Sequence, residues 1–173
     1  MTPFDAAKLR QLMEEAGIDL LLANTRHNVR YLTGGYYYHF NAHATRGGNS
    51  QYLAFVGLPR AREADAFYVA SRGEQRALEA MPIWIARQVF SRGGTIGAAE
   101  AAVEAARGLV PTSATIGVEL PFLPADAYLT LQHGLPHARF VDVTSLLHEL
   151  RAIKTEAELA RIGYTLQPLD IVL

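Results

Sequence analysis

The chain has 173 residues, of which 50% are hydrophobic and 19% are charged, and its formal net charge at pH 7 is −1. This composition excludes a disordered chain, and the balanced charge gives no overall field that would attract nucleic acid or an anionic membrane. The absence of cysteine excludes disulfides, thiolate zinc sites and a cysteine nucleophile. The length predicts a single domain.

Residues 2–35 predict a helix, a buried strand and a second helix, in that order. Thr2 and Asp5 have the spacing of a capping box at the start of the first helix, which Gly17 ends. The apolar run 20–23 is typical of a strand that is buried on both faces. A second helix opens at Thr25 and ends at the pair Gly34-Gly35.

The middle of the chain predicts a long loop, a pair of strands, a helix and a further strand. Residues 36–50 show no hydrophobic period and are expected to form the loop. Gly57-Leu58-Pro59 is expected to interrupt the strand pair, and Ser71 with Glu74 indicates a capping box. The predicted elements are strands at 51–56 and 65–70, a helix from Ser71 that ends before Pro82, and a β-rich run at 83–90.

Helices and strands alternate in the last part of the chain. Thr95 is predicted to cap an alanine-rich helix, and Thr155 with Glu158 forms a capping box for the final helix. Antiparallel pairing followed by this alternation predicts an α/β fold, a mixed β-sheet with helices on both faces. The predicted elements are helices up to Gly108, at 124–134, at 144–150 and from Thr155 to about Gly163, and strands at 115–119 and 139–143.

Motifs that carry chemistry are scarce. The histidine pair His133 and His137 encloses Gly134 and Pro136, so a regular helix cannot present both imidazoles to a metal. The glycines at 93–97 match neither the dinucleotide-binding pattern nor the phosphate-binding loop. No serine lies in a G-x-S-x-G elbow. We therefore predict no catalytic residue and no metal ligand in this chain.

One segment is a candidate for ligand recognition, residues 36–50. Its tyrosines, histidines and arginine offer stacking surfaces, hydrogen bonds and one fixed positive charge, which suit a small anionic or peptide ligand. The alternative is a surface loop that packs its aromatic rings on the domain or covers a subunit contact. The residues predicted to face a substrate are Tyr38, His39, His43 and Arg46.

Three sequence motifs follow one another along the chain. They are GIDLLL at 17–22, NVRYLTG at 28–34 and LRAIKTEAEL at 150–159. Together they make residues 4–162 resemble the N-terminal domain of the creatinase/prolidase family, which includes Xaa-Pro dipeptidases and aminopeptidase P. The resemblance implies a ribonuclease-H-like mixed α/β fold for residues 1–162.

The resemblance also implies a second, "pita-bread" catalytic domain after this one. That domain holds two metal ions, usually manganese, cobalt or zinc, through two Asp, one His and two Glu. None of those motifs is matched here, so no catalytic or metal-binding residue is carried over. Residues 163–173 are an atypical tail at the position where that catalytic domain would begin, because Gly163 and Pro168 break the expected helix.

The resemblance predicts the function of a non-catalytic domain in a metal-dependent Xaa-Pro peptidase-like hydrolase. Such a domain shapes the substrate site and supports a homodimer. No apolar run is long enough to span a bilayer and the first residues lack a signal peptide's apolar region, so a cytoplasmic protein is expected. Two alternatives remain: a stand-alone peptide-binding module, and a domain of a creatinase-like enzyme that acts on a small non-peptide substrate.

Overall fold

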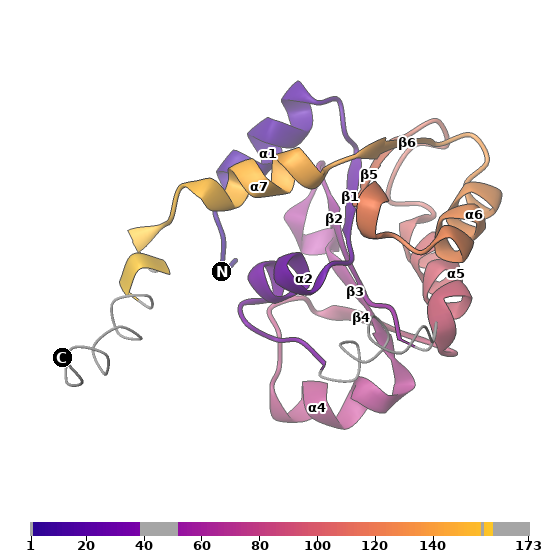
Figure 1. Ribbon diagram of the computed structural model, residues 1–173, viewed down its shortest axis with the longest axis horizontal. Helices are drawn as coiled ribbons and strands as arrows, with labels where there is room; N and C mark the ends of the chain where they lie inside the picture. Colours follow the sequence, from indigo (N-terminus) through magenta and orange to yellow (C-terminus); the bar gives the residue numbers. More distant parts are fainter. Residues whose placement is uncertain (1, 39–51, 157, 161–173) are drawn as a thin grey trace.

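The computed structural model describes residues 2–38, 52–156 and 158–160, and these form a mixed sheet between two layers of helices (Figure 1). The sheet has six strands in the order β4-β3-β2-β1-β5-β6. Only β2 runs antiparallel to its neighbours, β1 and β3, while the other pairs are parallel. The strands are β1 (Leu20–Ala23), β2 (Phe55–Pro59), β3 (Phe67–Ser71), β4 (Arg87–Ser91), β5 (Thr115–Val118) and β6 (Arg139–Asp142). The predicted α/β fold is confirmed.

The helices divide between the two faces of the sheet, as Figure 1 shows. Buried side chains of α1, α2, α4 and α7 pack on one face, and those of α5 and α6 pack on the other. The helices are α1 (Ala6–Glu15), α2 (Arg26–Thr33), α4 (Gln75–Ala80), α5 (Gly94–Ala106), α6 (Ala125–Gly134) and α7 (Thr144–Ala152). Short 3-10 turns lie at η1 (Glu63–Asp65), η2 (Arg72–Glu74) and η3 (Leu120–Phe122).

Strand β1 shows how the sequence builds both faces. Its side chains alternate, so Leu20 and Leu22 join the α5–α6 cluster while Leu21 and Ala23 join the opposite cluster. All four residues are fully buried, as the continuous apolar run predicted. The face against α5 is rich in alanine, whereas the face against α1, α2 and α7 holds Met13, two tyrosines and several leucines.

Several predicted helix ends are confirmed. Thr25 caps α2 and Gly34 ends it in the left-handed conformation at φ +83°. The capping box of Ser71 and Glu74 is present, and so is that of Thr155, whose N–H and hydroxyl both donate to Glu158. The predicted end of that last helix at Gly163 lies outside the described residues.

Two predicted helix caps are wrong. Helix α1 begins at Ala6 because Asp5, not Thr2, is the cap, and its carboxylate accepts the N–H of Lys8 at 2.9 Å. Thr95 lies inside the first turn of α5, which Gly93 precedes. Its hydroxyl donates to Asp126 of α6, so it links two helices and does not cap one.

The predicted strand boundaries need correction around Gly57. The strand expected at 51–56 is β2, which continues through Gly57-Leu58-Pro59. Gly57 makes no turn. It pairs with Phe67, whose ring fills the place of a side chain, and a Cβ built at Gly57 would lie 2.2 Å from the ring. The second strand begins at Phe67 because η1 takes up Glu63–Asp65, and in the run 83–90 only the part from Arg87 onward is strand.

Candidate functional site

The carboxyl ends of the five parallel strands meet at one edge of the sheet, which we call the carboxyl edge. Strands β1 and β5 are neighbours there, and the helices that follow them pack on opposite faces of the sheet. In α/β sheets, ligands bind in the crevice that such a reversal opens. The carboxyl edge between β1 and β5 is therefore the first place to look for a site.

Glu119, the residue directly after β5, lies at this place. Its side chain is 1% exposed and receives four hydrogen bonds. The backbone N–H groups of Asn24 and Thr25 donate at 2.7 and 2.9 Å, the Thr25 hydroxyl at 2.7 Å, and the side-chain amide of Asn28 at 2.6 Å. The N-terminus of α2 is thus occupied by the protein's own carboxylate, in the position where an anionic ligand would otherwise be held.

Three tyrosines follow the end of α2, and they contact the residues that follow β3 at the same edge of the sheet. Tyr36 is 7% exposed, and its hydroxyl donates to Glu74 at 3.1 Å. Its ring packs edge-to-face on Tyr68 with centroids 5.9 Å apart, and the Tyr68 hydroxyl donates to the same Glu74 oxygen at 2.8 Å. Thr33 holds the backbone of this segment by donating to the Tyr36 carbonyl at 2.8 Å.

Glu74 is fully buried beneath the tyrosines. Its second oxygen accepts the N–H of Ser71 at 2.8 Å, which closes the capping box. Burial raises the pKa of Glu74, and the hydrogen bonds from Ser71, Tyr68 and Tyr36 only partly oppose this. Burial, with the nearby Glu74, likewise raises the pKa of Tyr36 and that of Tyr68.

Tyr37 and Tyr38 extend this surface toward solvent. The guanidinium of Arg26 lies over the ring of Tyr37 at 5.7 Å from its centroid. The Tyr38 hydroxyl donates to the Gly73 carbonyl at 3.1 Å, and its ring lies 6.4 Å from that of Tyr52. The residues on either side of segment 39–51 therefore pack against each other, beside η2.

Of the four residues predicted to face a substrate, Tyr38 lies at the carboxyl edge. His39, His43 and Arg46 lie outside the described residues, so their role stays a prediction. Sequence reasoning missed Glu119 and the tyrosine contacts of Glu74. The available signal for Glu119 was a single acidic residue directly after an apolar strand.

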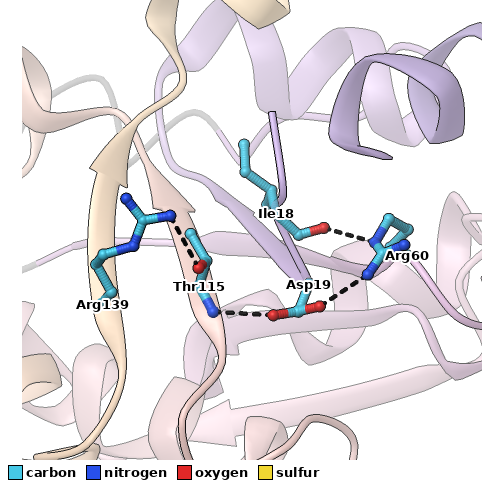
Figure 2. A network of polar contacts seen from close by, with 5 residues as sticks. All are labelled: Ile18, Asp19, Arg60, Thr115 and Arg139. Atoms are coloured by element: carbon cyan, nitrogen blue, oxygen red, sulfur yellow. Dashed lines mark hydrogen bonds and ion pairs between the residues drawn. The ribbon is translucent and has the colours of Figure 1, made fainter. Parts of the chain in front are cut away.

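The opposite edge, which we call the amino edge, is joined by a different polar network (Figure 2). Asp19 accepts the N–H of Thr115 and a guanidinium N–H of Arg60, both at 2.9 Å, and Arg60 also donates to the Ile18 carbonyl. Arg139 donates to the Thr115 hydroxyl at 3.2 Å. The hydrogen bond from Thr115 and then that from Arg60 lower the pKa of Asp19.

A metal site would need several ligating side chains close together in the part of the chain that the structure describes. No group of three or more His, Cys, Asp or Glu side chains there could hold a metal ion. The set of two Asp, one His and two Glu that the resemblance implies for the catalytic domain therefore has no counterpart among these residues. Within the same residues, no helix combines the length and hydropathy needed to cross a membrane.

Comparisons with known proteins agree with this fold. The chain resembles an Xaa-Pro dipeptidase from Bacillus anthracis, with 19% identity and a TM-score of 0.65 over 90% of this chain and 37% of that one. It also resembles the N-terminal domain of cytoplasmic peptidase PepQ from Mycobacterium tuberculosis, with 21% identity and a TM-score of 0.56 over 84% of this chain and 97% of that one.

A third similar structure is the aminopeptidase P from Streptococcus thermophilus, with 17% identity and a TM-score of 0.58 over 84% of this chain and 94% of that one. A search of curated proteins finds no significant match. Residues 6–153 match the family model described as the Creatinase/Prolidase N-terminal domain. The chain thus spans little more than a third of the Bacillus anthracis enzyme, and it belongs to the creatinase/prolidase N-terminal domain family.

Proposed function

We propose that this chain is the non-catalytic N-terminal domain of a metal-dependent Xaa-Pro peptidase-like hydrolase, in which it shapes the substrate site. Residues 1–162 form this domain, and the catalytic domain begins in the region of residues 163–173. The parent protein is a cytoplasmic homodimer that acts on peptides. Two divalent ions such as manganese, cobalt or zinc supply the hydrolytic chemistry, held by residues outside this chain.

The observation that carries the proposal is the anchoring of the tyrosine segment at the carboxyl edge. Tyr36 is fixed by Glu74, and Tyr38 by Gly73 and Tyr52. The residues that flank segment 39–51 are thereby held in place, and the Tyr38 and Tyr52 rings contact each other beside it. A segment fixed at both ends is suited to present His39, His43 and Arg46 to a substrate, since binding residues are concentrated on loops that a rigid scaffold positions.

Two buried carboxylates at the carboxyl edge support a non-catalytic role. A general base must reach its substrate within hydrogen-bond distance. Glu119 and Glu74 are 1% and 0% exposed, and their oxygens already accept bonds from backbone amides, hydroxyls and a side-chain amide. Neither can take a proton from a water or a peptide without breaking the contacts that join these elements.

The first test is to sequence the gene beyond the codon for Leu173. We expect a frame that continues for roughly 200 residues with two Asp, one His and two Glu as metal ligands. The 173-residue chain alone, with added manganese, is expected not to hydrolyse Xaa-Pro dipeptides. A stop codon directly after Leu173 would contradict the proposal and favour a stand-alone peptide-binding module. Dipeptide hydrolysis by the chain alone would contradict its non-catalytic role.

The second test concerns the substrate site of the full gene product. We expect Arg46→Ala to raise KM for an Xaa-Pro dipeptide about tenfold with little change in kcat, because a charged contact to the substrate is lost. The matched control is Arg62→Ala, which removes an exposed arginine whose ion pair with Asp65 lies at the amino edge. Unchanged kinetics in Arg46→Ala would contradict the prediction that Arg46 faces the substrate. Activity of the full gene product on creatine-like compounds alone would contradict a peptide substrate.

A further inference from the structure

A cavity of about 180 Å³ lies at the amino edge, away from the tyrosine segment. It opens between the connection from α5 to β5 and the connection from α6 to β6. In Figure 1 this corner lies on the side of α5 and α6, while α7 extends away from it toward the opposite side. The cavity takes no part in the function proposed above.

The inner wall of the cavity is apolar and made of small side chains. Ala106, Ala114 and Ile116 form it and are at most 1% exposed. Ala138 and Leu135 close its sides. Larger side chains at the alanine positions would fill this space, and unfilled apolar volume lowers stability in proportion to its size. Apolar cavities of about 150 Å³ stay dry and accept a six-carbon ring such as benzene.

The mouth of the cavity is polar. Among its lining residues only Arg107, Thr112 and His137 carry polar side chains, and all three are exposed. Arg107 donates one N–H to the Gly134 carbonyl at 3.2 Å, which holds the guanidinium beside the opening. Within the described residues it has no acidic partner and no second side-chain hydrogen bond.

The backbone that holds Arg107 is itself fixed. A Cβ at Gly134 would lie 2.6 Å from the Val103 side chain, so the end of α6 lies directly against α5. The Gly134 carbonyl is therefore in a constant position relative to Arg107, which ends α5. A fixed guanidinium with free donors is a typical recognition group for a carboxylate, because its planar fork donates two parallel hydrogen bonds.

We propose that this cavity binds a small aliphatic monocarboxylate. Its hydrocarbon chain of about four to six carbons lies against Ala106, Ala114 and Ile116, in keeping with the cavity volume. Its carboxylate accepts hydrogen bonds from Arg107 at the mouth, flanked by Thr112 and His137. This site is distinct from the carboxyl edge, where Glu119 occupies the helix N-terminus.

The experiment is an NMR titration of the isotope-labelled 173-residue chain with 4-methylpentanoate. We expect saturable binding with a Kd of about 1 mM, as small ligands of this size reach. The shifted backbone amides should be those of Ala106, Ala114 and their neighbours. The neutral 4-methylpentanamide should bind at least about tenfold more weakly, and acetate, which lacks the chain, should show no saturable shift at these residues.

Two variants separate the parts of the site. Arg107→Gln should weaken binding of 4-methylpentanoate about tenfold, whereas Arg76→Gln, an exposed arginine on α4, should leave it unchanged. Ala114→Leu should abolish binding by filling the cavity, and the half-exposed Ala138→Leu tests the same point if Ala114→Leu does not fold. No saturation up to about 50 mM, equal binding of acid and amide, or shifts confined to the carboxyl edge would each overturn the proposal.

Discussion

At each edge of the sheet one carboxylate links neighbouring elements, but the two carboxylates have different kinds of partner. At the carboxyl edge, Glu119 is 1% exposed and has no cationic partner among the described residues; all its donors are neutral. At the amino edge, the side chain of Asp19 is 28% exposed and pairs with Arg60, whose side chain is 35% exposed. The buried carboxylate therefore lacks the counter-ion that the more exposed one has.

The difference follows from the elements that each carboxylate meets. Glu119 lies at the N-terminus of α2, where unpaired backbone N–H groups and the helix dipole favour a negative charge. Asp19 lies where strands begin, and Thr115 supplies one backbone N–H while Arg60 supplies the charge. A helix N-terminus can thus replace an arginine as the partner of a carboxylate. This comparison predicts unequal losses when each acid is removed.

The largest effect is expected from Glu119→Ala. It leaves the half-buried N–H groups of Asn24 and Thr25 and the buried amide of Asn28 without an acceptor, which should lower the free energy of unfolding by about 4 kcal/mol. Denaturant titration measures this. Glu119→Gln keeps one acceptor oxygen and should lose about half as much. A loss below about 1 kcal/mol for Glu119→Ala would show that the helix N-terminus does not depend on this carboxylate.

The next effect tests the strand that runs between the two edges. Gly57→Ala places a methyl group inside the ring position of Phe67, which is fully buried and cannot move away, and should cost about 3 kcal/mol. The control is Gly97→Ala in α5, where the nearest atom is 3.7 Å away, and it should stabilise the protein by up to about 1 kcal/mol. Equal melting temperatures of the two variants would contradict this account of β2.

Asp19→Asn should cost less, about 1 kcal/mol at neutral pH, because Asp19 and Arg60 are both partly exposed and an asparagine can still accept the Thr115 N–H. The pKa of Asp19 is lowered in the folded chain, so its stabilisation is present above the unfolded value of 3.8 and is lost as pH falls through the folded value. The difference between parent and variant should therefore shrink between about pH 5 and pH 2. A difference that is constant over this range would exclude the charge as its cause.

The smallest effect at neutral pH is expected from Glu74→Gln, within about 1 kcal/mol of the parent. The pKa of Glu74 is raised in the folded chain, so its folded form prefers the proton, and the parent loses stability as pH rises from 4.5 through the folded value. Glutamine keeps the shape and cannot ionise. Denaturation curves of both proteins from pH 4 to pH 8 should show that the free energy of unfolding of the variant rises relative to that of the parent. A relative rise for the parent would contradict the raised pKa of Glu74.

The sequence predicted the fold well where the signal was local. The apolar run of β1, the Thr25 cap and the Ser71–Glu74 capping box each follow from neighbouring residues, and all are confirmed. The errors share a different cause. Glycine at position 57 predicts an interruption of the strands, whereas its actual role depends on Phe67 in the next strand. Threonine at position 95 predicts a helix cap, because its actual partner, Asp126, is distant in sequence.

The candidate site was less predictable for the same reason. The substrate-facing role of Tyr38 stays a prediction, and nothing local in the sequence indicates that Gly73 and Tyr52 hold its side chain. Glu119 is separated from Asn24 and Thr25 by more than ninety positions, and a single sequence carries no record of such pairing. Long-range polar contacts require the topology before they can be assigned.

The contact between Tyr38 and Tyr52 bears on how the length of the segment between them can vary in evolution. Because the sheet and η2 fix both flanks, the intervening stretch can gain or lose residues without altering the strands around it. Doubling the length of a closed loop adds only about 0.6 kcal/mol of entropic cost. The stretch between Tyr38 and Tyr52 can therefore vary in length while the packing of the sheet beneath it stays unchanged.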